Sequence, residues 1–456
     1  MLMDVLDLTR LQFAVVTIYH YFFVPLSISL AAVAAGLEIA WLRTRRERYL
    51  DLTKFVGKLL IVTFAVGVVT GLVQEFQFGM GWSAFAKFYG DVFGPTLAIE
   101  GMLAFFLEAT FLALWYFGWD RLPRLLHAAT IVIVSLGTVL SAFIILAANS
   151  FMQNPIAYAL DPTTGRARLT SFHELLLNKV NLAAFPHTLA GAAMVGGALL
   201  LAIAVWRLAA EPAHRTLARL GAWLMVAGGA MTALTGDHLG KVITEVQPMK
   251  MAAAEALYET TKGAPFSIVT TGPPFPSFSL DIPWLLSILA KGSPGATVQG
   301  LDDLQAQYAA QYGPGSYIPM IPVAFWTFRL MIGAGMLAAA IAAYYLWRTR
   351  KNRDAPTWLT RWLPLIPVLP AAANTLGWIF TETARQPWIA FGISKVADGI
   401  SPGLTSGEVL ASLIGFTVVY GVLAVAWFRV IRHVSRQPLH PAETPSEDSA
   451  EPAPVY

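Results

Sequence analysis

The chain has 456 residues, of which 56% are hydrophobic and 13% charged, with a formal net charge of +3. Its mean hydropathy of +0.58 is too high for ordinary soluble domains, and its charge gives no reason to expect a nucleic-acid partner. No cysteine is present, which excludes iron–sulfur clusters, covalently attached c-type haem and disulfides, so any redox cofactor is bound non-covalently.

Nine apolar segments are long enough to cross a membrane, since a helix needs about 20 residues to span the hydrocarbon core. Helices satisfy their own backbone in lipid, and no alternating barrel pattern is present. The chain is therefore predicted to be an all-α polytopic membrane protein. The expected spans, six within 1–236 and three within 319–436, are 13–42, 59–78, 93–117, 126–150, 182–208, 217–236, 319–347, 359–381 and 406–431.

The first span is expected to remain in the protein, because Asp4 and Asp7 precede it without a basic cluster, unlike a cleaved signal peptide. The basic residues are unevenly divided between the two sides of the membrane. Nineteen of the 31 Lys and Arg residues fall in or beside the short connections on one side. Because cytoplasmic connections are enriched in such residues, the C-terminus is predicted to be cytoplasmic and the N-terminus outside.

Two regions interrupt the run of helices. Residues 237–318 form one long external connection, rich in Pro and Gly, with a helical pattern at Met249–Lys262. A loop of this length in a compact protein usually carries function or is disordered. The tail, 437–456, has five prolines and several acidic residues, and it is predicted to be disordered in the cytoplasm.

Several polar side chains lie at membrane depth, where they are costly and are interpreted as functional by default. His20 and His187 lie near the outer ends of their spans, and Met331, Glu382 and Glu100 lie at similar depth in three others. Imidazole, thioether and carboxylate groups are plausible axial ligands of haem iron, and a His/Met pair is one known arrangement. Simpler interpretations remain: a hydrogen-bonded core histidine for His20, an interfacial one for His187 and a gap filler for Met331.

Charged residues in the same spans also need partners. Arg329 lies in an apolar run and needs an anionic partner, which a haem propionate would supply. Glu100 and Glu108 would lie about 80° apart around an ideal helix and about 12 Å apart along it, so both could line one proton path; alternatively, each pairs with a neighbouring helix. Glu382 and Arg385 could form a simple ion pair. The other histidines lie in predicted connections or the tail and are not expected to be ligands: His127, His173, His214, His238, His433 and His440.

Nine short stretches occur in a specific order: RLQFAVVTIYH, TKFVGKLL, GLVQEFQFG, AIEGMLAFFLEATF, GWDRL, ANSFMQNP, PHTLAG, FRLM and RQPW. In this combination the chain resembles subunit I of cytochrome bd-type quinol oxidases over roughly residues 4–432. Ala384 is a departure, because the family usually has Gly before Arg-Gln-Pro-Trp. The external connection looks like the short form of the family's quinol-binding loop.

The resemblance implies three haems: a low-spin haem b, a high-spin haem b, and a haem d or a further haem b in its place. His187 and Met331 would be the axial ligands of the low-spin haem, with Arg329 close to it. His20 and Glu382 would each ligate one of the other two haems, and which takes which is open. Two further residues would contribute to the haem sites: Trp378, between the haems, and Arg385.

The resemblance also implies the remaining roles and partners. Glu100 would stand near the oxygen-reducing site, and Glu108 would bring it protons from the cytoplasm. Lys250 and Glu255 match residues tied to quinol oxidation in the external loop. The implied partners are membrane quinol, oxygen, a homologous second subunit and often a small single-helix subunit, all in the bacterial plasma membrane. The type of quinone is left open.

Because every candidate ligand lies toward the outer face, electrons need not cross the bilayer, whereas protons for water formation must come from inside. The chain is thus expected to oxidise quinol outside, reduce oxygen to water and generate a proton-motive force without a pump. One alternative is a haem-free proton-coupled transporter, in which buried acids and histidines relay protons; however, no two matched halves with interrupted helices are present. Another is a membrane anchor that carries haem for a partner.

Overall fold

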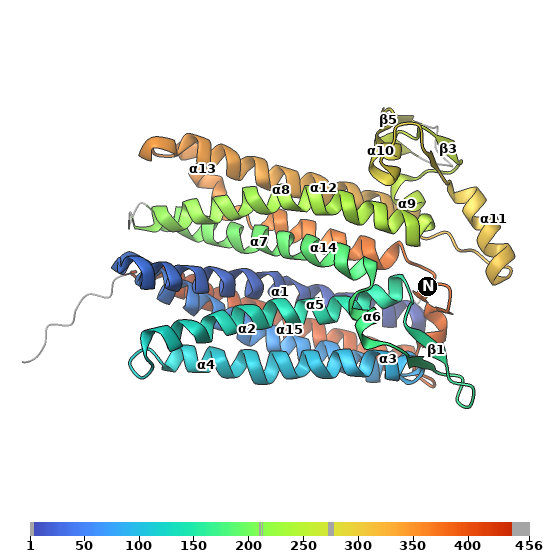
Figure 1. Cartoon of the computed structure of the whole chain (residues 1–456), viewed down its shortest axis with the longest axis horizontal. Coiled ribbons are helices and arrows are strands. Elements are labelled where there is room, and N and C mark those ends of the chain that lie inside the picture. Colours follow the sequence, from blue (N-terminus) through green and yellow to red (C-terminus); the bar gives the residue numbers. More distant parts are fainter. Residues whose placement is uncertain (1–3, 209–210, 212, 272–277, 440–456) are drawn as a thin grey trace, which may run out of the picture.

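The computed structural model describes residues 4–208, 211, 213–271 and 278–439. Within this part of the chain, nine helical segments are long and apolar enough to cross a membrane, which confirms the predicted class. They run roughly parallel as one bundle (Figure 1). Their bounds are α1 Val5–Thr44, α2 Glu47–Met80, α3 to α4 Ser83–Phe117, α5 Arg124–Gln153, α7 Lys179–Arg207, α8 His214–Val246, α12 Ile321–Arg348, α13 to α14 Thr357–Thr383 and α15 Ser406–Arg436.

Two of the nine spans are not continuous α-helices. The third consists of α3 (Ser83–Gly101), a π-helical segment η1 (Met102–Glu108) and α4 (Ala109–Phe117). The eighth consists of α13 (Thr357–Trp362), a 3-10 turn η3 (Leu363–Leu365) and α14 (Val368–Thr383). Proline explains the second interruption, because it lacks the backbone N–H that an α-helix requires, and Pro364 and Pro367 lie at the junction.

The sixth span extends further than the sequence predicted. Helix α8 continues to Val246 rather than ending near 236, so the long connection begins at about residue 247. The added turns are polar and hold an ion pair between Lys241 and Asp237 at 2.6 Å. Hydropathy marks the part of a helix inside hydrocarbon, whereas polar pairs four residues apart stabilise its continuation in water.

Helix α7 forms the centre of the bundle and packs closely against α8. An ideal Cβ placed on Gly197 would lie 2.7 Å from the Gly221 carbonyl oxygen, and one on Gly221 would lie 2.5 Å from the Gly197 oxygen. Small residues at such a crossing let two membrane helices approach through their backbones. The remaining helices surround this pair, and α1 contacts α2, α5, α7 and α15.

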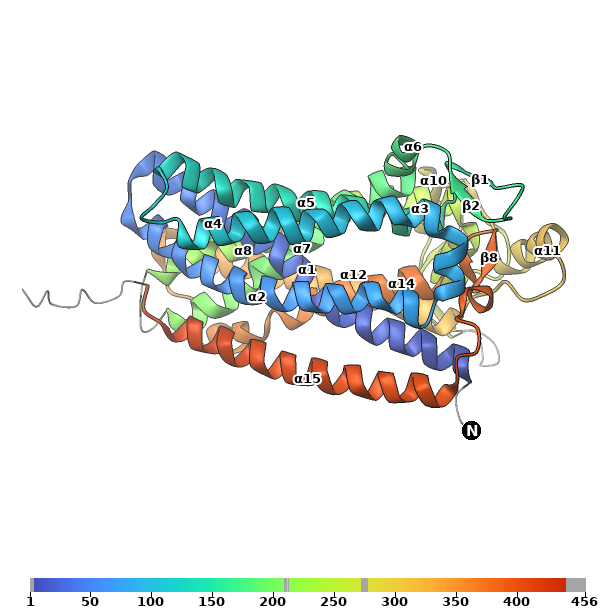
Figure 2. The same ribbon diagram turned by 90° about the horizontal axis from the view of Figure 1, so that it is seen from below.

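The long connection is compact and mostly irregular, with short helices and hairpins at the same end of the bundle as the N-terminus (Figures 1 and 2). Helix α9 ends at Glu255, because Ala256 adopts a left-handed conformation with φ 49°, so the expected helix over Met249–Lys262 is correct only in its first part. Strands β3 and β6 pair, as do β4 and β5. The bounds are α9 Pro248–Glu255, β3 Thr261–Lys262, β4 Phe266–Thr271, β5 Phe278–Ile282, α10 Leu285–Lys291, β6 Thr297–Val298 and α11 Leu301–Tyr312.

Two smaller connections lie at this same end. One joins α5 to α7 and the other joins α14 to α15, and each contains a short antiparallel hairpin. Their elements are β1 Tyr158–Leu160, β2 Ala167–Leu169, α6 Phe172–Leu176, β7 Trp388–Ala390, β8 Ser394–Lys395 and the 3-10 turn η4 Val396–Gly399, while the 3-10 turn η2 Arg350–Asn352 lies at the opposite end. Residues 440–456, most of the tail predicted to be disordered, lie outside the described residues.

His127 lies in the first turn of α5 and is buried. Its Nδ1 lies 2.6 Å from Glu38 Oε1, and its Nε2 lies 2.8 Å from the Trp115 carbonyl oxygen. Trp115 also donates its indole N–H to Glu38 at 2.6 Å. Both ring nitrogens of His127 therefore have protein partners. Its predicted place in a connection was wrong, because it lies inside helix α5.

Candidate functional site

His20 of α1 faces a Thr-Gly pair on α2. Its Nδ1 lies 3.1 Å from Thr70 Oγ1. An ideal Cβ on Gly71 would lie 3.0 Å from His20 Cε1, so only glycine leaves the ring this much room. One ring nitrogen is thus engaged by the protein, and Nε2 is on the other side of the imidazole.

His187 of α7 has the same surroundings on a different pair of helices. Its Nδ1 lies 3.3 Å from Thr235 Oγ1 on α8. An ideal Cβ on Gly236 would lie 3.1 Å from His187 Cε1. The two histidines chosen from the sequence as haem ligands therefore share one local arrangement, although they lie far apart in the chain.

Met331 of α12 faces α14. An ideal Cβ on Gly377 would lie 2.8 Å from the Met331 sulfur. Any larger residue at position 377 would therefore displace the thioether. Trp378 follows directly in α14. Imidazole and thioether groups, each placed against a glycine, form a donor set that fits haem iron.

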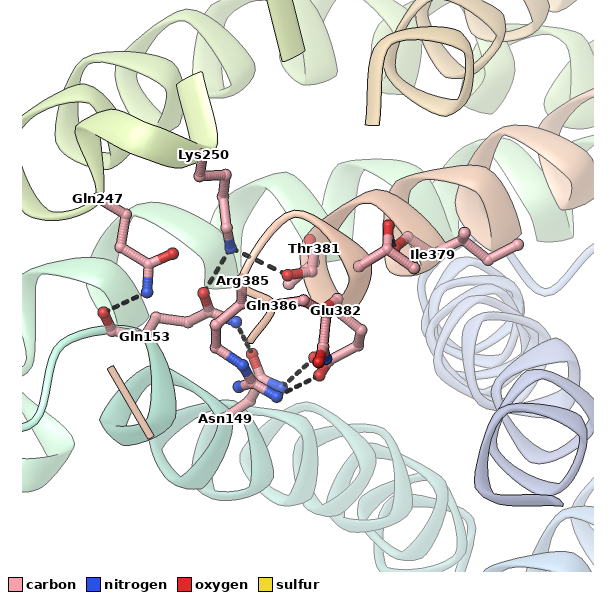
Figure 3. Close-up of polar contacts among 10 residues, drawn as sticks. Asn149, Gln153, Gln247, Lys250, Ile379, Thr381, Glu382, Arg385 and Gln386 are labelled. Carbon is pink, nitrogen blue, oxygen red and sulfur yellow. Dashed lines mark hydrogen bonds and ion pairs between the residues drawn. The ribbon is translucent and has the colours of Figure 1, made fainter. Parts of the chain in front are cut away.

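Glu382 and Arg385, at the end of α14, form the ion pair that the sequence left as an alternative (Figure 3). The Arg385 Nη2 donates to Glu382 Oε2 at 2.5 Å, and Asn149 Nδ2 of α5 donates to Glu382 Oε1 at 2.8 Å. Among the described residues, however, the Nε and Nη1 groups of Arg385 are buried and have no partner. Two unsatisfied donors on a buried cation fit an anionic group from outside the chain, such as a haem propionate.

The change from glycine to Ala384 does not disturb this turn. Ala384 has φ −77° and ψ −6°, a right-handed conformation that any residue adopts. The departure from the family pattern is therefore compatible with the local backbone.

Lys250 of α9 extends into the bundle and reaches the same network (Figure 3). Its Nζ donates to Gln153 Oε1 of α5 at 2.5 Å and to the Thr381 carbonyl oxygen of α14 at 3.0 Å. Gln247 donates to the Gln153 carbonyl oxygen at 2.6 Å. Burial and, to a smaller extent, the nearby Arg385 charge lower the pKa of Lys250 to about 7, against the opposing effect of Glu382. The external connection is thus joined directly to the helix that carries Glu382.

Arg329 has a different anionic partner from the haem propionate expected from the sequence. Its Nη1 and Nη2 donate to the two carboxylate oxygens of Glu255 at 3.1 and 2.6 Å. It also donates to the carbonyl oxygens of Ala254 and Ser267. These five bonds use all five guanidinium N–H groups. Glu255 is only 4% exposed, and burial raises its pKa despite the opposing effect of Arg329.

The carboxylates of the third span occupy an unusual helical segment. Glu100 accepts a hydrogen bond from Ser141 of α5 at 3.0 Å. Glu108 is 4% exposed, and its Oε1 has no partner among the described residues. The π-helical segment Met102–Glu108 follows Gly101, so the separation worked out for an ideal α-helix does not apply. A π segment inside an α-helix often marks a functional site.

Glu75 of α2 is a site residue that the sequence analysis missed. Its carboxyl interacts with that of Glu100. The signal was present, because Glu75 is an acidic residue in an apolar span, as Glu100 is. Glu75 is therefore a further candidate for the proton path that contains Glu100.

The fold and these groups define a multi-pass membrane protein suited to holding haem. The family described as "Cytochrome bd terminal oxidase subunit I" matches residues 8–439. The chain belongs to this family. It is therefore a subunit of a terminal oxidase with haem cofactors, and the interpretations as a haem-free transporter or a simple haem anchor are set aside.

Similar proteins span nearly the whole chain. "Cytochrome bd ubiquinol oxidase subunit 1" of Bacillus subtilis (strain 168) is 40% identical over 448 residues, covering 96% of this chain and 95% of that protein. "Cytochrome bd-II ubiquinol oxidase subunit 1" of Escherichia coli (strain K12) is 33% identical over 512 residues, covering 97% and 98%. The structure of bd oxidase from Geobacillus thermodenitrificans superposes with a TM-score of 0.86 and 29% identity, covering 95% of this chain and 99% of that chain.

Proposed function

We propose that the chain oxidises membrane quinol at the outer face, beside the 247–320 connection, and that the electrons reduce oxygen to water at a haem site inside the bundle. Quinol oxidase activity follows from the family and from relatives that are named ubiquinol oxidases. The proposed sidedness is supported by charge. The connection and the N-terminus lie at one end, and the nineteen clustered basic residues lie in or beside the connections at the other.

We propose three haems, with His187 and Met331 as axial ligands of a low-spin haem b. His20 and Glu382 would each hold one of the other two, a high-spin haem b and a haem d or a further haem b. Bound haem would supply electron transfer and oxygen binding. Glu382 already accepts bonds from Asn149 and Arg385, so these two side chains would orient its carboxylate.

The observation that carries this proposal is the incompletely satisfied guanidinium of Arg385. Its side chain is only 5% exposed, and its Nε and Nη1 lack partners in the described part of the chain. A buried charged donor without a partner is costly. A propionate beside Glu382 would satisfy both groups, with Trp378 one turn earlier on α14.

Lys250 and Glu255 are the proposed quinol-side residues. The Lys250 Nζ has a pKa of about 7, so near neutral pH it can take up a proton released by a quinol hydroxyl. Glu255 is held by Arg329, which fixes the start of β4 and the end of α9 against α12. We infer that Glu255 acts mainly by holding the connection in place over the membrane helices.

Protons for water formation would reach the oxygen site from the cytoplasm through the third span. Helix α3, which carries Glu100, lies toward the outer end, and α4, which directly follows Glu108, lies toward the basic end (Figure 2). Glu108 would therefore be nearer the basic end than Glu100. Each carboxyl can hold one proton and pass it on through intervening water. Charge would then be separated across the membrane without a pump.

The family implies a second, homologous subunit, and we propose in addition a small single-helix subunit. The lipid environment would be the bacterial plasma membrane, as the relatives' organisms suggest. One relative of 27% identity is named a putative menaquinol oxidase subunit. Ubiquinol and menaquinol are therefore both to be tested as substrates.

The proposal is tested on the purified complex by a reduced-minus-oxidised spectrum together with quinol-driven oxygen consumption. We expect three haems, and we expect His20→Ala to remove one of them and abolish oxygen consumption while the low-spin haem stays reducible. His433→Ala, at an exposed position in α15, is the control and should behave as the wild type. Turnover that persists in His20→Ala would make His20 a core histidine, and a complex without haem would refute the proposal.

A further inference from the structure

The candidate ligands His20 and His187 each contact a threonine on the neighbouring helix, followed directly by the glycine that gives the ring room. The pairs are Thr70-Gly71 on α2 and Thr235-Gly236 on α8. Each helix pair consists of two consecutive spans, α1 with α2 and α7 with α8, and the contact joins the same atoms, Nδ1 and Oγ1, in both. Such repetition indicates a function for the threonine hydroxyl beyond filling space.

The direction of these hydrogen bonds follows from what else each hydroxyl contacts. Thr70 Oγ1 lies 3.0 Å from the carbonyl oxygens of both Val66 and Gly67. Thr235 Oγ1 lies 2.6 Å from the Met231 carbonyl oxygen. A carbonyl oxygen only accepts, so each hydroxyl donates its single hydrogen to its own helix. Its lone pairs are then left to accept from the histidine.

The proton of each neutral imidazole is therefore on Nδ1. The backbone of Gly67 also interacts with His20, and that of Thr232 with His187. With Nδ1 as the donor, Nε2 carries the free lone pair. This is the tautomer that a histidine needs in order to bind a metal through Nε2, and the hydrogen bond of the other ring nitrogen commonly determines it.

We propose that Thr70 and Thr235 are positioning residues that fix the Nδ1–H tautomer and the ring orientation of His20 and His187, and so set how strongly Nε2 binds haem iron. This inference rests on the proposed roles of the two histidines. A hydroxyl is a weaker acceptor than the carboxylate found beside many metal-bound histidines. Each imidazole is thereby kept a neutral ligand of moderate basicity.

The test compares Thr235→Val, which keeps the shape but removes the acceptor, with Thr235→Ser, which keeps the acceptor. In the purified complex we measure low-spin haem content, its reduced α-band and its midpoint potential. We expect Thr235→Val to weaken haem retention, by roughly 10–100-fold in affinity as for other outer partners of metal ligands, and to raise the midpoint potential. Thr235→Ser should restore both. Should the valine variant fail to assemble, Thr235→Ala replaces it, because alanine also lacks the hydroxyl and is smaller.

Thr244→Val is the matched control on the same helix, because the Thr244 hydroxyl donates to the Gly240 carbonyl just as the Thr235 hydroxyl donates to the Met231 carbonyl, and it lies about two and a half turns beyond Thr235. Thr70→Val supplies a reciprocal control: it should alter the haem held by His20, read as a shift in the resonance Raman iron–histidine stretch, and leave the low-spin haem unchanged. Unchanged spectra and potentials in Thr235→Val would overturn the inference and assign the tautomer to the backbone interaction alone. By contrast, His187→Ala with a normal low-spin haem would refute the ligand assignment itself.

Discussion

Lys250 shows how burial sets the chemistry of a charged side chain. It is 2% exposed and its nitrogen contacts Gln153 and Thr381 from two membrane helices. Burial and the nearby Arg385 charge lower its pKa to about 7, against the opposing effect of Glu382. The group is therefore an ammonium below this pH and an amine above it, so it can exchange a proton in the working range of an enzyme.

This gives a prediction for pH dependence. Quinol turnover should rise as pH increases through about 7, because only the amine can take a proton from quinol. Lys250→Arg stays charged at all working pH values and should lose this rise. Lys241→Arg, at a half-buried lysine paired with Asp237, is the control. A pH profile in Lys250→Arg that matches the wild type would contradict a role for Lys250 in proton uptake.

The same lowered pKa makes a stability prediction of definite sign. Because the folded-state pKa of Lys250 is about 7 and the usual value is 10.5, the folded protein binds fewer protons than the unfolded chain between these values. Its contribution to stability is fully present above the usual pKa and is lost as pH falls through about 7. The melting temperature of the wild type should therefore increase relative to that of Lys250→Met as pH increases over this range.

Met331 gives a prediction for the low-spin haem. Met331→Leu nearly conserves volume, so the fold should remain intact, but leucine has no thioether to bind iron. The low-spin spectrum should be lost or converted to a high-spin one, as measured in the reduced complex. Met336→Leu, at a position 68% exposed on the same helix, should change nothing. An unchanged low-spin spectrum in Met331→Leu would remove Met331 from the ligand set.

At the scale of elements, the contact between α7 and α8 depends on two glycines that let the backbones touch. We expect Gly221→Ala to destabilise the protein by about 1–3 kcal/mol, the usual cost of adding atoms to a packed core, because the new Cβ would lie 2.5 Å from the Gly197 carbonyl oxygen. Gly415→Ala on α15 is the control, since its Cβ would meet no atom within 4 Å. Thermal unfolding in detergent measures both, and equal stabilities would show that α7 and α8 can separate without cost.

Hydropathy predicted the number and order of the membrane helices because each apolar run reports burial in hydrocarbon. It did not predict where the helices end. The last turns of α8 are polar and stabilised by the Lys241–Asp237 pair, and α9 ends where Ala256 takes a left-handed conformation. The π-helical segment before Glu108 depends on packing against α5, where Gly137 makes room for the Glu108 side chain, so single-span periodicity could not reveal it.

The sequence could predict those candidate site residues that are polar or ionisable within an apolar membrane span. Histidines and acids in apolar spans pointed to His20, His187, Glu100 and Glu108, and the family resemblance supplied the roles. Contacts between distant segments were not predictable. The partner of Arg329 lies on the external connection, and the threonines that engage the histidines lie on neighbouring helices, so only the fold brings them together.

At the scale of the whole molecule, the two ends of the bundle differ in chemistry. The outer end, by our assignment, carries the long connection, the buried Lys250 and the Glu382–Arg385 pair. The other end carries short connections rich in basic residues. On this assignment, electrons would remain near the outer end, whereas protons would travel through the third span. The oxidase would then separate charge across the membrane because its quinol site and its proton-uptake path lie at opposite ends, without a pump.

Glu108 provides the test of this arrangement, because it is the buried acid between the basic end and the Glu75–Glu100 pair. Glu108→Gln keeps size and most hydrogen bonding but cannot release a proton. We predict normal haem reduction by quinol, oxygen reduction slowed by roughly 10²-fold, the low end for losing a proton-transfer group, and loss of proton uptake from the cytoplasmic side in sealed vesicles. Glu245→Gln, at an exposed residue paired with Lys179, is the control. If Glu108→Gln vesicles oxidise quinol and acidify the outer side at the wild-type rate, protons reach the oxygen site by another route and Glu108 serves packing against α5.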